Sequence, residues 1–277
     1  MRDFTDSFSA VTIRFVLNAK YICAAILLAF AARLEASPVT VALGSKAKES
    51  RFSAETKTDG DLTAQLRTKL VEAEAEFNRT QAEMGSTTNL PPGATLAESI
   101  EYRSGLQWLV QTYQAHLDTL GAIETIRQRR QEFERTVQAW TGLADPPPYS
   151  VLFVDDLRDV IRSLEDKIKL DETARTFAEK LAAGAEASMK EADGKLRWIN
   201  EQLEDATDHA LIVRLSWQRE HAQVRSRMSA AQFASFEASA QKKSEELAEH
   251  TQRLAFAHRQ LTLAAQHVSF SKDDLDR

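Results

Sequence analysis

Apolar residues recur along most of this chain at the three- and four-residue spacing that places them on one face of an α-helix. The spacing predicts four helices, over about residues 61–84, 95–140, 151–204 and 210–267. Little interrupts them, because the 277 residues include only nine glycines and six prolines. We therefore expect an all-α protein whose long antiparallel helices form an extended coiled-coil bundle or hairpin within one helical domain, residues 61–268.

The third predicted helix carries a heptad pattern, the alternating four- and three-residue spacing of a coiled-coil seam. From Leu157 to Leu203, twelve of the fourteen positions in this spacing are apolar. The fourth helix has the same pattern from Phe233 to Val268, where nine of eleven positions are apolar. The residues that we expect to build the core between these two helices are Leu157, Ile161, Leu164, Ile168, Leu247, Leu254 and Leu261.

The stretch EDATDH, residues 204–209, separates the two heptad-patterned helices. If it forms a turn, the helices fold back on each other as an antiparallel hairpin. The alternative is one continuous helix, because aspartate and threonine interrupt a helix only weakly. We favour the hairpin.

Polar residues interrupt the seam of the third helix at Asp171 and Arg175. These residues lie four apart, so they could pair and set the register as a polar layer. Alternatively, the seam drifts there, and Ala174 and Phe177 take over the core. In the fourth helix, His250 could act as a pH sensor, since an unperturbed histidine has a pKa of about 6.5. The alternative is a histidine at the edge of the seam, with its ring half in water.

Three consecutive prolines stand between the second and third helices, in the stretch DPPPYSVLFVDDLRD. Proline lacks a backbone donor and excludes the helical conformation from the residue before it, so the second helix must end here. Ser150 is suited to cap the next helix. We expect a rigid corner that fixes the angle between the two helices, formed by Pro146, Pro147, Pro148, Tyr149 and Ser150.

The first 36 residues have the pattern of a secretory signal peptide. Lys20 precedes twelve apolar residues, YICAAILLAFAA, and the small residue Ala36 precedes Ser37. Twelve helical residues span about 18 Å, short of a hydrocarbon core of about 30 Å, which favours cleavage over an uncleaved membrane anchor. We expect an exported, periplasmic protein, with the inner membrane as a place of association, and a flexible polar tether over residues 37–60.

The charge balance argues against nucleic-acid binding. The chain carries 35 basic and 41 acidic residues, a net charge of −6, whereas contacts to phosphates require a basic surface. The most basic stretch, RQRRQEFER at residues 127–135, is interpreted as a solvated helix face, because Glu132 and Glu134 lie within it.

Motifs for chemistry are missing from the sequence: it has no HExxH, no GxSxG, no glycine-rich phosphate loop, and one cysteine, Cys23, which lies within the signal segment. We therefore expect neither a metal nor a cofactor, no small-molecule substrate and no enzymatic activity.

Three segments resemble the N-terminal periplasmic region of large bacterial mechanosensitive channels of the small-conductance superfamily. They are PPPYSVLFVDDLRD (146–159), LRWINEQLED (196–205) and VSFSKDDLDR (268–277). The resemblance extends over about residues 95–277. It implies a helical region that follows a signal peptide and precedes inner-membrane helices, one of which lines the pore. Residues 269–277 are expected to start a further helix that the chain does not complete.

The resemblance implies a function without chemistry. We expect a periplasmic extension or assembly element of a mechanosensitive channel, with no pore of its own. Its expected partners are copies of itself or inner-membrane channel subunits. The alternative is an independent periplasmic coiled-coil adaptor or scaffold protein.

Overall fold

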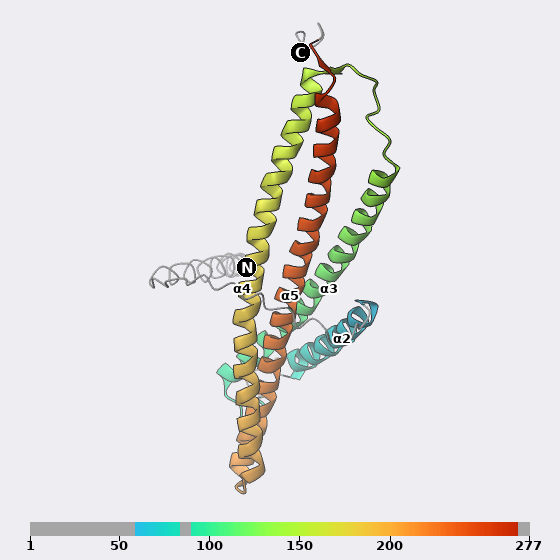
Figure 1. Ribbon diagram of the computed structural model, residues 1–277. Helices are drawn as coiled ribbons and strands as arrows, with labels where there is room; N and C mark the ends of the chain where they lie inside the picture. Colours follow the sequence, from blue (N-terminus) through green and yellow to red (C-terminus); the bar gives the residue numbers. More distant parts are fainter. Residues whose placement is uncertain (1–58, 84–89, 271–277) are drawn as a thin grey trace, which may run out of the picture. The chain divides into compact units, whose positions relative to one another are not determined.

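The computed structural model describes residues 59–83 and 90–270, which all belong to one compact unit of the chain. Nearly all of them form four helices (Figure 1), which are α2 (Asp59–Glu83), α3 (Leu96–Ala139), α4 (Val151–Asp205) and α5 (His209–Ala265). The expected all-α fold is therefore confirmed. The predicted helices begin and end within two residues of these bounds.

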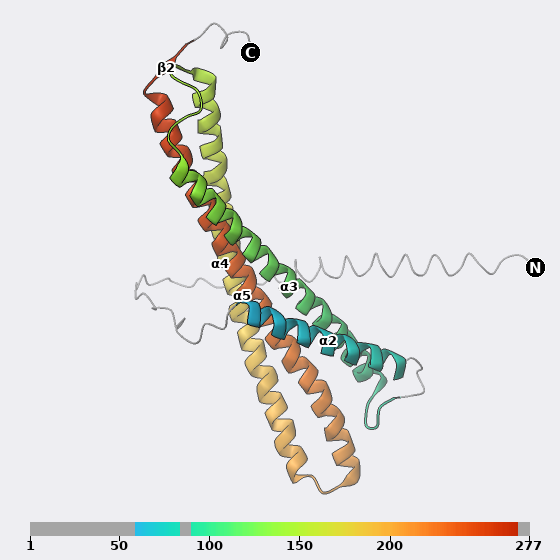
Figure 2. The ribbon, with the colours of Figure 1, turned by 90° about the vertical axis from the view of Figure 1, so that its right-hand side faces the viewer.

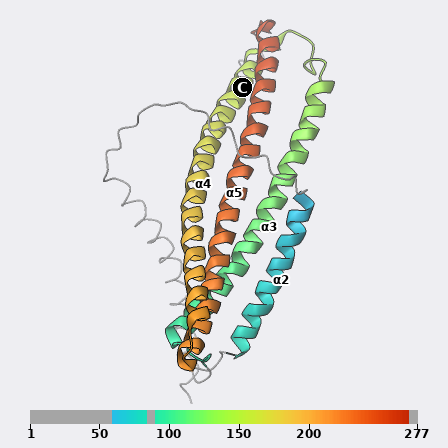
Figure 3. The same ribbon diagram turned by 60° about the horizontal axis from the view of Figure 1, so that its bottom comes forward.

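The helices pack as a row in the order α4, α5, α3 and α2 (Figure 3). The beginning of α4 packs on the end of α5, so these two helices run antiparallel. In contrast, α3 runs parallel to α5, because residues near both of their N-termini are paired, and so are residues near both of their C-termini. Helix α5 thus lies in the middle, with one side on α4 and another on α3.

A tight turn at residues 206–208 connects α4 to α5 (Figure 2). The Asp208 carboxylate accepts a hydrogen bond of 3.0 Å from the backbone N–H of Leu211, which satisfies one of the unpaired donors at the start of α5. The chain therefore forms the hairpin rather than one continuous helix. The short polar side chain of Asp208 favours the turn over a continuous helix, a choice that helix propensity alone does not determine.

The face that α4 turns toward α5 is the predicted heptad seam, since all fourteen of its positions are buried or half-buried. Leu157, Ile161 and Leu164 are buried and Ile168 is half-buried. From α5, Leu254 and Leu261 pack against this group, and Leu247 is half-buried. Removing one such leucine from water stabilises the fold by about 1.5–3 kcal/mol.

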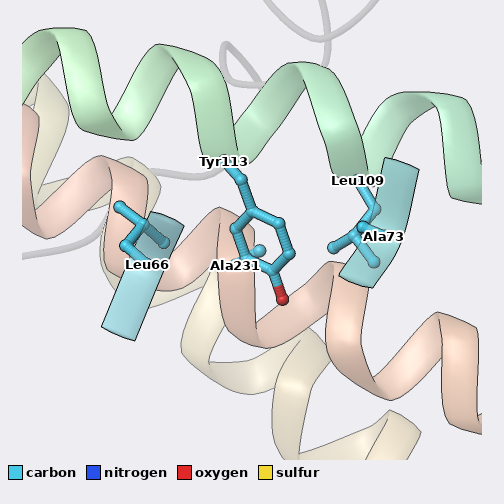
Figure 4. Close-up of a cluster of buried hydrophobic side chains, with 5 residues drawn as sticks. All are labelled: Leu66, Ala73, Leu109, Tyr113 and Ala231. Carbon is cyan, nitrogen blue, oxygen red and sulfur yellow. The ribbon is translucent and has the colours of Figure 1, made fainter. Parts of the chain in front are cut away.

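A second core forms where α2, α3 and α5 meet (Figure 4). Its buried members are Leu66 and Ala73 from α2, Leu109 and Tyr113 from α3, and Ala231 from α5. The two alanines leave room for the larger side chains of α3, so three helices approach closely without a void. This cluster holds α2 against the rest of the unit.

The corner between α3 and α4 contains the three prolines, which lie exposed on the surface. Helix α4 begins where the Ser150 hydroxyl accepts hydrogen bonds from the backbone N–H groups of Leu152 and Phe153, at 3.1 and 3.4 Å. Tyr149 is buried, and its backbone N–H donates to the carbonyl of His267 at 2.9 Å. The segment that follows α5 is thereby bonded to the corner.

Two short strands at this corner were not predicted. Strand β1 (Tyr149–Ser150) pairs in parallel with β2 (Val268–Ser269). They exist because α5 ends at Ala265, two residues before its predicted end, which leaves an extended segment free to pair. The predicted extension of the helical domain to residue 268 is corrected accordingly.

Several predictions concern residues outside the described part of the chain. The signal peptide lies entirely there. Of the further helix start expected over residues 269–277, residues 271–277 also lie there, whereas Ser269 belongs to β2 and Phe270 is not helical. The predicted tether also lies there, except for its last two residues, Asp59 and Gly60, which already belong to α2.

Candidate functional site

Several charged side chains lie between the helices, where they form hydrogen bonds and ion pairs from one helix to the next. The first is a buried polar layer in the seam between α4 and α5, which we name the seam layer. In it, Asp171 is 5% exposed. Its Oδ2 lies 2.7 Å from Nδ1 of His250, and its Oδ1 accepts a hydrogen bond of 3.3 Å from Nζ of Lys243. A carboxylate of α4 thus joins two polar residues of α5.

The seam layer differs from both sequence interpretations of this region. Asp171 does not pair with Arg175, whose Nε lies 3.5 Å from Oε1 of Glu179. Neither does the seam drift, because Phe177 is 57% exposed and Asp171 keeps its place in the core. The reason is that a seam side chain faces the neighbouring helix, where Asp171 finds two partners.

Lys243 also connects the seam layer to the next turn of α5. Its ammonium group donates to Oε2 of Glu246 as well as to Asp171. The bond to Glu246, followed by the interaction with Asp171, raises the pKa of Lys243 above its usual range. The lysine therefore stays charged in the fold, and its positive charge is compensated on two sides.

Between α3 and α5, arginines of the basic stretch pair with glutamates of the neighbouring helix. Arg127 and Arg130 both bind the carboxylate of Glu245, the former through Nε at 3.0 Å. Arg129 donates to Glu249 at 3.2 Å, and that glutamate is only 5% exposed. The interpretation of this stretch as a solvated face is therefore wrong for Arg127 and Arg130, which are half-buried against α5, whereas Arg129 pairs with α5 but stays exposed.

A third site, which we name the clamp, joins three helices through Glu76 of α2. Its Oε1 accepts a hydrogen bond of 2.9 Å from the Tyr102 hydroxyl of α3, and its Oε2 accepts one of 2.6 Å from Arg227 of α5. Burial, and then the charge of Glu76, raises the pKa of the Tyr102 hydroxyl above its usual range. The hydroxyl thus remains a donor. A cleft of about 410 Å³ adjoins the clamp, and Arg79 and Glu220 also line it.

Glu98, near the start of α3, has two roles. Its carboxylate closes a capping box with Thr95 and accepts two hydrogen bonds from Arg214 of α5, at 2.7 and 2.6 Å. The bonds from Arg214, then those from Thr95, lower the pKa of Glu98 to about 2. Arg214 also donates to the carbonyl of Gly93 at 2.6 Å, so this ion pair fixes the loop before α3.

A cleft of about 510 Å³ lies at the proline corner. Its walls come from three parts of the chain: Trp140 at the end of α3, the loop with Pro148 and Tyr149, and Gln260 of α5. Trp140 packs edge-on against Phe256, with ring centroids 5.2 Å apart, and the guanidinium of Arg259 lies over the Trp140 ring, 5.2 Å from its centroid. Of the predicted corner residues, Tyr149 is the one that enters the core.

The interactions observed within these sites are ion pairs and hydrogen bonds. The carboxylates of the seam layer and the clamp are bound to cationic side chains of α5. No three histidine, cysteine or carboxylate side chains in residues 59–83 and 90–270 are placed to hold a metal ion. Likewise, no helix of the described segments is long and apolar enough to cross a membrane.

Sequence reasoning missed the clamp and the Glu98 pair. The TLAE sequence that starts α3 is a signal for the capping box, and so for the position of Glu98. No comparable signal marks Glu76, Tyr102 or Arg227, since their partners are distant in sequence and each looks like an ordinary helix-surface residue.

Comparisons of the chain with known protein families, with curated proteins and with solved structures gave no match.

Proposed function

We propose that this protein is an exported helical scaffold, a non-enzymatic assembly element of the cell envelope. One observation carries the proposal: in the hairpin of the 55-residue α4 and the 57-residue α5, α3 binds α5 along much of its length. Ion pairs join them near the start of α5 and past its middle, and Trp140 packs on Phe256 near its end. Helices that are locked in register in this way transmit position over distance. They suit a protein that spaces or orients others.

The partner class that we propose is the mechanosensitive channel. The proposal rests on the resemblance of the corner, of LRWINEQLED and of VSFSKDDLDR to the periplasmic region of large channels of the small-conductance superfamily. In this role the chain adds a rigid periplasmic arm and contributes no pore. A role in ion selectivity is not expected, because selectivity belongs to the residues that line a pore.

The location of the protein in the cell can be tested separately from its partner. Fractionation of cells that express the chain should place it in the periplasm, in a form that is shorter than the full chain by about 36 residues, as a cleaved signal peptide requires. Accumulation in the cytoplasm at full length would refute export, and with it the envelope scaffold.

The partner is tested in cells by site-specific crosslinking. A photoreactive amino acid at Phe270, which is 67% exposed next to the proline corner, is crosslinked in intact cells, and the product is identified by mass spectrometry. A second position, the exposed Val71 of α2, serves as the control. We expect inner-membrane channel subunits to be captured at Phe270 and not at Val71. Capture of other envelope proteins alone would refute the channel partner.

A second function, the independent envelope adaptor, is favoured by a different observation. Trp198 and Leu211, close to the tip of the hairpin, are 55% and 47% exposed. A hairpin that carries exposed apolar residues at its tip can bind a partner there, away from the corner. The adaptor predicts crosslinks at Trp198, whereas the channel proposal predicts them at Phe270.

A further inference from the structure

Helix α4 carries a second line of apolar residues that no described element covers. Its members are Phe153, Val160, Leu170, Ala174, Phe177 and Leu181, and we name them the outer stripe. They lie on one heptad-spaced line of the helix, which the polar residues Asp156, Ser163 and Lys167 interrupt. Phe153 also contacts Tyr149 of the corner, with ring centroids 6.0 Å apart, and Ala174 is half-buried. Leu170 is 68% exposed, Phe177 57% and Val160 49%. Each position of the outer stripe comes one residue before a position of the seam. Because successive helical residues are about 100° apart, the outer stripe lies about a quarter turn away from the face of α4 that contacts α5.

Charges along the outer stripe are separated by sign. Among the positions within the stripe or next to it on its solvent side, the first half contains Asp156, Asp159 and Asp166 and no basic residue. Lys167 lies near the middle of the stripe, and the second half contains Lys180 and no acidic residue before Glu191. All five of the side chains that make this pattern are exposed. Asp159 and Asp166 also pair within α4, with Arg162 at 3.0 Å and with Lys169 at 3.3 Å, so Asp156 and Lys180 carry most of the difference in charge. The stripe is therefore negative at one end and positive at the other.

We propose that the outer stripe binds the outer stripe of a second copy of this chain, with the two α4 helices antiparallel. Only this orientation sets the acidic half of each copy against the basic half of the other. A parallel pair would set like charges side by side, and an anionic membrane would repel the acidic half. The proposal concerns self-association and does not depend on a channel partner.

The charges also select the register. Apolar positions of the two stripes face each other only at steps of one heptad. One of these alignments places Lys180 within about one turn of the partner's Asp156 and the partner's Asp159. In it, the two-fold axis passes between residues 168 and 169 of both helices. In this register Phe177 packs on the partner's Val160, and Phe153 lies opposite the partner's Gly184, where an added Cβ would meet nothing within 4 Å. Large side chains thus meet smaller ones.

The first test measures the oligomeric state of the full chain by sedimentation velocity over a range of concentrations. We expect a dimer. Phe177→Lys should weaken it about tenfold or more, because it buries a charge in the interface. The matched control, Val71→Lys, alters an equally exposed apolar residue on α2 and should leave the dimer unchanged. A monomer at all concentrations, or equal effects of both variants, would overturn the proposal.

The second test examines the orientation by charge exchange. Lys180→Asp should weaken the dimer, because the new carboxylate faces two aspartates of the partner. Combining it with Asp156→Lys and Asp159→Lys should restore the dimer, since opposite charges face each other again. These residues are all exposed, so the fold should tolerate the changes. Failure of the triple variant to recover would rule out the antiparallel register.

Disulfide crosslinking gives an independent measure of orientation. In a background in which Cys23 is replaced by serine, Leu170→Cys lies next to the two-fold axis and should form covalent dimers on oxidation. Gly184→Cys should not, because the two copies of that position would be about 45 Å apart. Crosslinking at both positions would indicate a parallel pair, and crosslinking at neither would contradict the interface.

Discussion

At the scale of single residues, Asp171 determines how α4 and α5 can slide against each other. Its two partners, Lys243 and His250, occupy seam positions of α5 that are one heptad apart. A slip of α5 by one heptad would put Phe236 or Ala257 in place of one partner, and the buried carboxylate would lose a hydrogen bond. An unsatisfied buried polar group costs about 1–3 kcal/mol, so this one residue disfavours the neighbouring registers.

The seam layer can be tested by removing the carboxylate. Asp171→Ala should lower the free energy of unfolding by about 1–3 kcal/mol, because it leaves His250 without its partner in the seam. The control is Asp166→Ala, which removes an exposed carboxylate of the same helix that pairs with Lys169. This variant should change the free energy of unfolding by less than about 0.5 kcal/mol. Urea denaturation measures both. Equal losses would mean that the buried layer contributes no more than a surface pair.

Glu98 makes a pH-dependent contribution whose sign follows from its pKa. The value is lowered from 4.5 to about 2 in the fold, so the folded chain binds fewer protons than the unfolded chain between these limits. The contribution is thus complete above about pH 5 and disappears as the pH falls toward 2. Glu98→Gln should therefore be less stable than the wild type at pH 7, by about 1 kcal/mol.

The measurement is thermal unfolding of both proteins between pH 7 and pH 2. The difference in melting temperature should shrink steadily below about pH 5 as the wild-type carboxylate becomes protonated. A difference that stays constant down to the lowest pH would show that the glutamine variant loses the capping box rather than the charge.

The residues of the seam layer were identifiable from the sequence, but their pairing was not. The polar positions stand out against an apolar heptad pattern, and the spacing of Asp171 and Arg175 suggests a local pair. The local pair does not form, because Asp171 binds Lys243 and His250 of α5 instead, and Arg175 lies next to Glu179. Contacts between helices depend on which residues of the two helices lie opposite each other, and that is set by the turn at 206–208.

At the scale of elements, periodicity predicted helices where one face is buried, and it was weakest where a helix packs on two sides. Helix α4 packs mainly on α5, and its seam was found over its full length. Helix α5 lies between α4 and α3, so most of its positions are at least half-buried and its first half shows no single stripe. The corner strands escaped prediction because two residues carry no period.

The contact between α3 and α5 makes a prediction about two glycines of the same helix. A Cβ at Gly105 would lie 2.9 Å from Sδ of Met228 and 3.2 Å from Val224, whereas one at Gly121 would meet nothing within 4 Å. Gly121→Ala should raise the free energy of unfolding by about 1 kcal/mol through helix propensity. Gly105→Leu should lower it by about 1–3 kcal/mol, because α3 must move away from α5.

Chemical denaturation of the two variants measures this difference, and Gly105→Ala provides an intermediate case. The flexible Met228 side chain can turn aside for one methyl group, so this variant should fall between the other two. If Gly105→Leu is as stable as the wild type, the helices do not approach each other closely at this position.

At the scale of the whole molecule, α5 is the element on which the others depend. It supplies partners to Asp171 of α4, to Glu98 and the arginines of α3, and to Glu76 of α2. Each contact joins residues that are distant in sequence, so the packing of the row resists separation of any one helix. The proposed scaffold role requires such a dependence, because a scaffold must keep its helices in fixed relative positions.

The last prediction concerns the proline corner, where the ends of three helices meet. Replacing Pro146, Pro147 and Pro148 with alanine restores three backbone donors and removes the steric block to helix, so α3 can extend past Trp140. Gly142, with a φ of +150°, then remains as a breaker worth only about 1 kcal/mol. Extension would pull Tyr149 away from the carbonyl of His267 and from the cluster that it forms with Leu157 and Ala264.

We therefore expect the triple variant of the full chain to have a larger maximum dimension in small-angle scattering and a lower free energy of unfolding. Part of the loss, about 0.4–1 kcal/mol for each proline, comes from the greater freedom of the unfolded chain. The rest comes from the corner contacts, so Tyr149→Ala should reproduce that second part of the loss without lengthening the molecule. If the triple variant keeps both its dimension and its stability, the corner is held by Tyr149 and the Ser150 cap alone, and the prolines do not set the angle between α3 and α4.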